Sequence, residues 1–444
     1  MPPNILLIIA DSVRAKNMSL YGYGRRTTPK LNEFASKATV YTQARSPGSW
    51  SLPSHASLFS GLEVPEHGLT SRQMKMTAGQ TIWEELQESK GYSTAVFSGN
   101  PFVTTDAYGL TRGFETIRAN LPQYKYPFDA RNPEFLEESS NAEYLTACLR
   151  ASRPVRSILN GGLLKVGRSV PWLVPSSLVP QRTNSARQYA DAFLQWVADR
   201  ETQWAACINF VDAHWPYQPR SRFDNWGGQR AREIHDTIEH HTFDFYSGQK
   251  PWWKRRVLES LYDGAIRQID DTIGYLMHEL EQSNALEDTF VVITSDHGEG
   301  FGEPSRMKQG LNIAGHQTGG HEVLFHVPLV VKEPGQKDSE RIDKIASLTQ
   351  FPEMTRQLVR QDRTETSFAH GRPVIASADY DSRYAEATEE WPEKYRLAMD
   401  RSQFEGTVRV VYENNQDRVT KHATWVSAGV SVESASPLEN IRCS

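Results

Sequence analysis

One short polar stretch of this sequence could hold a nucleophile. Residues 49–61 read SWSLPSHASLFSG, which places hydroxyls, a proline and a histidine at the entrance of an expected helix. A hydroxyl there lies near unpaired backbone N–H groups and the positive end of the helix dipole, which favour negative charge. Ser51 is therefore a candidate nucleophile. The same residues also suit an ordinary helix start, because Ser is a common N-cap and Pro is common in a first turn.

Acidic residues and histidines follow three apolar runs of strand length elsewhere in the chain. Residues 3–10 lead into Asp11, residues 289–294 lead into Asp296 and His297, and residues 206–211 lead to His214. Continuous apolar runs are typical of buried parallel strands, and open α/β sheets bind ligands beyond the carboxyl ends of their strands. We therefore expect these side chains to meet at one edge of a sheet, with Asn100 after another strand, residues 94–97.

The order of these motifs resembles the sulfatase family of the alkaline phosphatase superfamily, up to about Gln350. The resemblance rests on the following segments: NILLIIADSVR at 4–14, YGY at 21–23, TPKL at 28–31, SLPSHASL at 51–58 and DHGE at 296–299. It implies an alkaline-phosphatase-like α/β fold, with a large, mostly parallel central sheet flanked by helices and a small C-terminal α+β domain. We expect a catalytic domain over residues 1–360, with an insertion at about 120–182, and the small domain over residues 361–444.

The resemblance also implies a metal site and an acid. Asp11, Asp296 and His297 would bind one divalent cation, and Ser51 would complete the site. Carboxylate-rich ligation favours Ca²⁺ or Mg²⁺, with Mn²⁺ also suitable, while an imidazole ligand keeps Zn²⁺ open. His214 and His316 would bind the anionic group or protonate the departing oxygen. We thus expect a hydrolase of sulfate esters in which Ser51 is the nucleophile or its precursor.

The sequence departs from the family pattern at three places. His55 stands where the family has the arginine of its Cys/Ser-x-Pro-x-Arg motif, whose first residue is oxidised to formylglycine, and we include His55 among the catalytic candidates. Ser12 stands where a second aspartate normally follows the first. Asn100 lies in a segment where the family has basic residues, and we assign Asn100 and Arg14 to substrate binding.

These departures leave a second chemistry open, because related enzymes use an unmodified Ser or Thr directly. Ser51 would then attack phosphorus as an alkoxide, in a phosphoester hydrolase or phosphotransferase. In that version a second metal would bind at Asp212, His214 and His316. A catalytically silent binding protein on the same fold is a third, less favoured reading. The cluster formed by His235, His240 and His241 is interpreted as a solvated surface.

Composition limits the partners. The 444 residues carry 49 Lys and Arg against 54 Asp and Glu, a formal charge of −5, which argues against nucleic-acid binding. The expected substrate is a sulfate or phosphate ester of a small molecule or a glycan. The three cysteines have neither metal nor redox spacing. No apolar run is long enough to cross a bilayer, and residues 3–10 are interpreted as a first strand and not as a signal peptide, so the expected compartment is the cytoplasm.

Periodicity predicts the remaining elements. Apolar residues at helical spacing predict helices over 28–37, 82–89 and 257–280, a helix beginning at Ser185, and, from the family resemblance, a helix over 345–359. Alternating apolar residues on either side of a polar turn predict a hairpin from residues 407–412 and 419–425.

Overall fold

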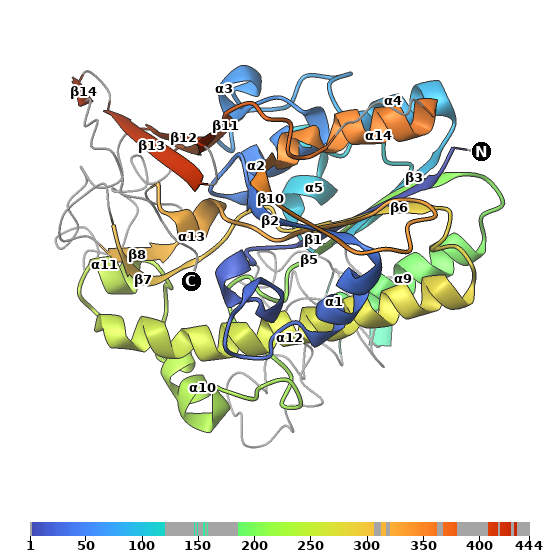
Figure 1. Cartoon of the computed structure of the whole chain (residues 1–444). Coiled ribbons are helices and arrows are strands. Elements are labelled where there is room, and N and C mark those ends of the chain that lie inside the picture. The colour runs from blue at the N-terminus through green and yellow to red at the C-terminus, as the bar shows by residue number, and fades with distance from the viewer. Residues whose placement is uncertain are drawn as a thin grey trace.

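The computed structural model describes residues 2–119, 185–305, 312–316, 320–361, 367–379, 407–415, 418–427 and 430–432, and the single residues 146, 149, 154, 155 and 158. Its main sheet, which lies at the centre of the molecule in Figure 1, has eight strands. Their order is β10-β2-β9-β6-β1-β5-β3-β4. The strands are β1 (Asn4–Ala10), β2 (Thr39–Arg45), β3 (Ser93–Ser98), β4 (Thr116–Arg118), β5 (Trp204–Phe210), β6 (Thr289–Thr294), β9 (Leu329–Lys332) and β10 (Glu340–Ser347). Only β9 within this sheet runs antiparallel, against β2 and β6.

Strand β1 lies inside the sheet and pairs in parallel with β5 and with β6. Residues 5–9 of this strand are all completely buried, which explains why the sequence shows a continuous apolar run and no alternation. The predicted strands at 3–10, 94–97, 206–211 and 289–294 are confirmed to within two residues. Because β1, β3, β5 and β6 are parallel, their carboxyl ends meet at one edge, where the predicted site residues follow.

Helices cover both faces of the main sheet (Figure 1). One face packs against α1 (Pro29–Phe34), α9 (Ala186–Ala198), α10 (Gly228–Asp236), α11 (Phe243–Tyr246) and the long α12 (Trp252–Gln282). The other face packs against α2 (Ser51–Ser60), α4 (Ile82–Lys90), α5 (Pro101–Thr104) and α14 (Phe351–Arg360), with α3 (Val64–His67) beside α2. No helix in the described part of the chain is both long and apolar enough to span a membrane.

A smaller antiparallel sheet lies at the C-terminal side of the chain. It contains β11 (Val374–Asp379), β12 (Thr407–Asn415), β13 (Arg418–Ser427) and β14 (Val430–Val432), and the predicted hairpin is β12–β13. Its apolar residues share one core with α13 (Glu322–Phe325). A two-stranded hairpin, β7 (Gly300–Pro304) and β8 (Asn312–Gly315), extends from the end of β6.

The structure corrects one predicted element and leaves two untested. The helix expected over 345–359 begins only at Phe351, because Ile345 and Ala346 still belong to β10 and pair with β2. The expected insertion at 120–182 lies outside the described residues, apart from five single positions. The domain boundary near residue 360 stays a prediction.

Candidate active site

Ser51 is the first residue of α2, and the extended backbone of Trp50 precedes it. The serine side chain is almost buried, with 5% of its surface exposed, and its Oγ lies 3.2 Å from Nε2 of His297. The hydroxyl therefore occupies the amino end of a helix, where the backbone dipoles favour an anion. The predicted nucleophile and one predicted metal ligand thus lie in contact, although 246 residues separate them in the sequence.

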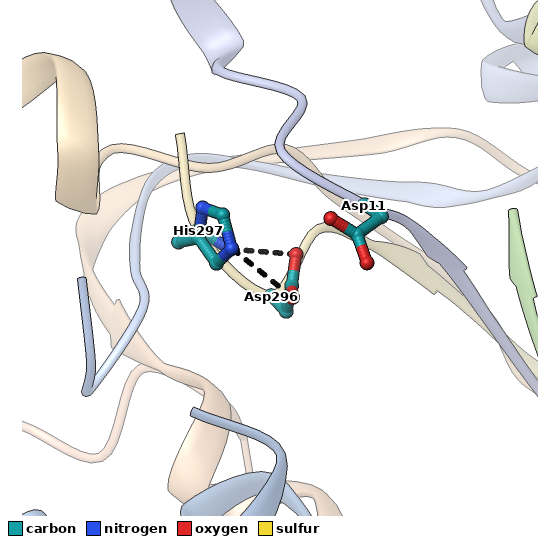
Figure 2. Close-up of side chains that lie close together, drawn as sticks. All are labelled: Asp11, Asp296 and His297. Carbon is teal, nitrogen blue, oxygen red and sulfur yellow. Dashed lines mark hydrogen bonds and ion pairs between the residues drawn. The ribbon is translucent and has the colours of Figure 1, made fainter. Parts of the chain in front are cut away.

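Asp11, Asp296 and His297 form a buried cluster beside this hydroxyl (Figure 2). One ligand atom from each lies within 4.8 Å of the others, and within the described residues this is the one such group of His, Cys, Asp or Glu. Oδ2 of Asp296 is buried and accepts no hydrogen bond. Two buried carboxylates with an unsatisfied oxygen need compensating positive charge, so the residues present fit a divalent cation.

Four histidines at this edge are anchored through Nδ1. Nδ1 of His55 lies next to the Ser51 carbonyl oxygen, and Nδ1 of His214 lies next to the Trp215 carbonyl oxygen. Nδ1 of His297 lies next to the Gly298 carbonyl oxygen, and Nδ1 of His316 lies next to the Glu299 carboxylate. An Nδ1–H that donates to such an oxygen leaves the lone pair on Nε2. His297 can therefore bind a metal through the Nε2 atom that contacts Ser51.

His214 and His316 approach the cluster from separate segments. The ring centroid of His316 lies 4.3 Å from that of His297 and 5.5 Å from that of His214. Burial, followed by the charge of His297, lowers the pKa of His316, and Glu299 opposes this shift. The structure therefore places His316 beside His297 and His214 beside His316, and the role of these two residues as acids stays a prediction.

Asn100 contacts the metal cluster directly. Its Nδ2 donates to Oδ2 of Asp11 at 2.9 Å, and its Oδ1 accepts from the N–H of Phe102 and caps α5. Burial alone raises the pKa of Asp11, but the nearby His214, His297 and His55 outweigh burial and keep this pKa below its usual value. With its amide engaged in this way, Asn100 orients a metal ligand, and its predicted contact with substrate stays a prediction.

Two predicted site residues lie in other environments. The fully buried guanidinium of Arg14 pairs with Glu259 and Glu303, so the structure does not offer it to a substrate. Asp212 accepts hydrogen bonds from the N–H of Ala186 and from Gln268, and burial raises its pKa to about 6. Asp212 does not join His214 and His316, so the second cation site of the phosphoesterase alternative is not assembled.

The histidines interpreted as a solvated surface are part of a ring stack, which corrects that interpretation. Trp215 packs against His235 at 4.4 Å and against His241 at 5.4 Å between ring centroids. His241 also approaches His316 to 6.4 Å, and burial lowers its pKa well below 6.5. The charged sequence around these residues suggested exposure, whereas their tertiary partner is the tryptophan that follows His214.

Sequence reasoning did not assign a role to Glu299 or Arg255. Oε2 of Glu299 lies 3.1 Å from Nδ1 of His316, and Arg255 binds the other carboxylate oxygen at 2.6 Å. Both side chains are completely buried. Glu299 follows the DHG motif, which signals its location, but Arg255 comes from α12 and has no local signal. Together they fix the orientation of the His316 ring.

Comparison with known proteins agrees with this geometry. The family model described as Sulfatase matches residues 3–358. Similar curated proteins include arylsulfatase K of Canis lupus familiaris, 21% identical over 79% of this chain and 62% of that protein. The ulvan-active sulfatase of Formosa agariphila is 20% identical over 75% of this chain and 56% of that protein. The chain thus spans about three fifths of the length of the curated relatives it matches.

Solved structures share the fold at low sequence identity. A phosphonate monoester hydrolase of Agrobacterium radiobacter matches with a TM-score of 0.60 at 16% identity, covering 96% of this chain and 89% of that one. A structure described as BT4656 with its substrate D-glucosamine-2-N,6-O-disulfate matches with a TM-score of 0.57 at 15% identity, covering 95% and 91%. With the family model matching most of its length and the motif residues assembled at one sheet edge, the chain belongs to the sulfatase family.

Proposed function

We propose that this protein is a divalent-metal-dependent hydrolase of sulfate esters, with Ser51 as the nucleophile or as the precursor of a formylglycine. The observation that carries the proposal is the contact between the Ser51 hydroxyl and His297 within the buried Asp11–Asp296–His297 cluster. A bound divalent cation would supply positive charge to the oxygens of a sulfate group. The curated relatives that support this substrate class are longer than this chain, so the activity is inferred from the site.

The chain's own residues provide the other steps. The amino end of α2 stabilises negative charge on the attacking group at position 51. His214 and His316 present Nε2 atoms, because their Nδ1 atoms are occupied. One of these rings, in the form that carries a proton on both nitrogens, donates its Nε2 proton to the departing oxygen and returns to the neutral form. The pair Glu299 and Arg255 holds His316 in this orientation. These residues act on the ester group, and they do not determine whether the organic part of the substrate is a small molecule or a glycan.

A second candidate is hydrolysis or transfer of a phosphoester by an unmodified Ser51. The observation in its favour is His55, which takes the place of the family's arginine and binds the Ser51 carbonyl oxygen at 2.7 Å. A motif without that arginine is a poor match to the one in which Cys or Ser becomes formylglycine. An unmodified Ser51 hydroxyl would be activated either by Nε2 of His297, acting as a base, or by a bound divalent cation.

The deciding experiment is peptide mass spectrometry of residue 51 in protein purified from its native host. A peptide two hydrogens lighter than the serine form indicates formylglycine and supports sulfate-ester hydrolysis. An unmodified serine, together with faster turnover of p-nitrophenyl phosphate than of p-nitrophenyl sulfate, supports the second candidate. Ser51→Ala is the background control for both assays. Absence of turnover and of bound Mn²⁺ in the wild-type protein would favour the binding-protein reading over both enzymes.

A further inference from the structure

Asn209 is a buried polar residue at the carboxyl end of β5, next to the last residue of that strand. Its exposed fraction is 0%, although it lies in the apolar run Trp204–Phe210. Ala205 and Cys207 on the same strand pack into the core beneath α2, and side chains alternate between the two faces of a strand. Asn209 therefore points to the face that carries the nucleophile helix, as Asp11 does after Ile5, Leu7 and Ile9 on β1.

The amide of Asn209 is only half satisfied. Its Nδ2 lies 3.4 Å from Oδ2 of Asp11, the same oxygen that Asn100 binds. Its Oδ1 is buried and has no hydrogen-bond partner in the described part of the chain. A buried acceptor without a donor is unfavourable, so this oxygen is expected to meet a donor or a cation.

The cation site has lost one oxygen ligand relative to the family pattern. Ser12 takes the place of the second aspartate, and its side chain is already engaged, since its Oγ donates to Oδ1 of Asp11 at 2.9 Å. Asp11, Asp296 and His297, with Ser51 as the expected fourth member, would then provide one ligand each. Ca²⁺ takes six to eight oxygen ligands and Mg²⁺ takes six, and the carbonyl oxygen of Asn is a standard ligand of this kind.

We propose that Oδ1 of Asn209 is a ligand of the divalent cation and replaces the carboxylate lost at Ser12. The proposal rests on the metal dependence proposed above and not on the ester that is hydrolysed. The assignment explains two buried unsatisfied oxygens at once, Oδ1 of Asn209 and Oδ2 of Asp296. It also explains why β5, an otherwise apolar strand, carries the amide of Asn209 next to its last residue, facing the carboxylate of Asp11.

The test is a Mn²⁺ titration by isothermal calorimetry on protein freed of metal with EDTA. Asn209→Leu keeps the approximate shape and removes the oxygen, and we expect a loss of Mn²⁺ affinity of at least tenfold. Asn209→Asp keeps an oxygen ligand and restores the carboxylate count of the family, so its affinity should stay within a few-fold of the wild type. Cys207→Ala, on the same strand face, is the packing control and should bind Mn²⁺ as the wild type does.

The outcomes separate the roles of Asn209. If Asn209→Leu and Asn209→Asp both lose Mn²⁺ affinity, the ligand assignment is wrong. The amide then serves only to donate to Asp11, because a carboxylate at position 209 cannot donate and would repel Asp11. Unchanged affinity in Asn209→Leu also contradicts it. Urea unfolding without metal identifies a variant that merely fails to fold. In that case the Mn²⁺ titration is repeated with Asn209→Gln and Asn209→Ser. A wild type that binds Mn²⁺ but hydrolyses neither ester overturns the proposed function alone.

Discussion

The imidazole of His55 is bonded to the backbone of Ser51, one helical turn earlier. Its Nδ1 lies 2.7 Å from the Ser51 carbonyl oxygen and 3.6 Å from Oδ2 of Asp296, and the ring is completely buried with its edge against Phe59. His55 therefore lies between the backbone of the predicted nucleophile and a predicted metal ligand. A family arginine, with a longer and permanently charged side chain, would reach beyond this position.

Replacing His55 by Phe should lower turnover about 10- to 100-fold, the usual cost of removing a partner that orients metal ligands. The phenyl ring keeps the contact with Phe59 but cannot donate to the Ser51 carbonyl oxygen and places no polar atom near Asp296. Steady-state kinetics provide the measurement, on whichever of p-nitrophenyl sulfate and p-nitrophenyl phosphate the wild type hydrolyses. His278→Phe, at an exposed position of α12, is the matched control. Wild-type turnover in His55→Phe would show that the ring is only a packing element.

Asp296→Ala should abolish metal binding and turnover and leave the fold in place at reduced stability, because it removes a predicted ligand and the acceptor of the Ser12 and His297 N–H groups but no apolar core contact. In the wild type, Mn²⁺ at a hundred times its Kd should raise the free energy of unfolding by about 2.7 kcal/mol. The variant should show no such increase in urea unfolding. Asp288→Ala, an exposed position just before β6, should respond to Mn²⁺ like the wild type. Metal-dependent stabilisation in Asp296→Ala would refute the site assignment.

Gly298→Ala should damage the site through the backbone. The N–H of Gly298 donates to the Leu324 carbonyl at 2.8 Å, and a Cβ on Gly298 would lie 1.9 Å from the Val323 carbonyl oxygen. Either α13 or the segment that holds His297 must then move. We expect a loss of stability of about 1–3 kcal/mol, typical of overpacking, and weaker Mn²⁺ binding.

The control for that substitution is Gly24→Ala, because a Cβ at Gly24 meets no other heavy atom within 4 Å. Urea unfolding and the Mn²⁺ titration are run on both variants. Equal stability and equal affinity in the two variants would mean that the contact between Gly298 and α13 adjusts without cost.

The strands and the metal cluster were predictable because they follow local patterns. Residues 3–10 and 289–294 are apolar without interruption, and each ends at an aspartate, so the parallel arrangement brings Asp11 and Asp296 together. Arg14 was assigned wrongly because its partners are remote: Glu259 lies 245 residues away and Glu303 lies 289 residues away. No local pattern distinguishes an arginine that binds such carboxylates from one that binds a substrate.

Asn209 and His241 were missed for different physical reasons. The predicted strand ran through Asn209 to Val211, so the asparagine counted as an interior strand residue, whereas β5 ends at Phe210. His241 lies in a charged stretch, and its contact with Trp215 arises only when that stretch folds back over the end of β5. The roles of Asn209 and His241 depend on which strand or loop packs next to each of them in the folded protein. The local sequence around each residue does not contain this information.

Stability should fall in mild acid partly through His67, which lies in α3 beside the nucleophile helix. Its Nδ1 accepts from the N–H of Leu69, and its Nε2 bonds with Oγ of Ser57, each at 2.9 Å. A proton on Nδ1 would oppose the Leu69 N–H. Burial also lowers the pKa of His67 from 6.5 to about 4.

The sign of the effect follows from this lowered pKa. Between pH 6.5 and about 4 the unfolded chain binds the His67 proton and the folded chain does not, so acid favours unfolding in this window. His67→Gln should reduce the slope of the free energy of unfolding against pH by at most about 1.4 kcal/mol per pH unit. Urea unfolding at several values between pH 7 and 4 measures the difference from the wild type. His278→Gln, at an exposed position of α12, is the matched substitution control. An identical slope in His67→Gln and wild type would show that the folded protein accepts the proton at His67 as readily as the unfolded chain does.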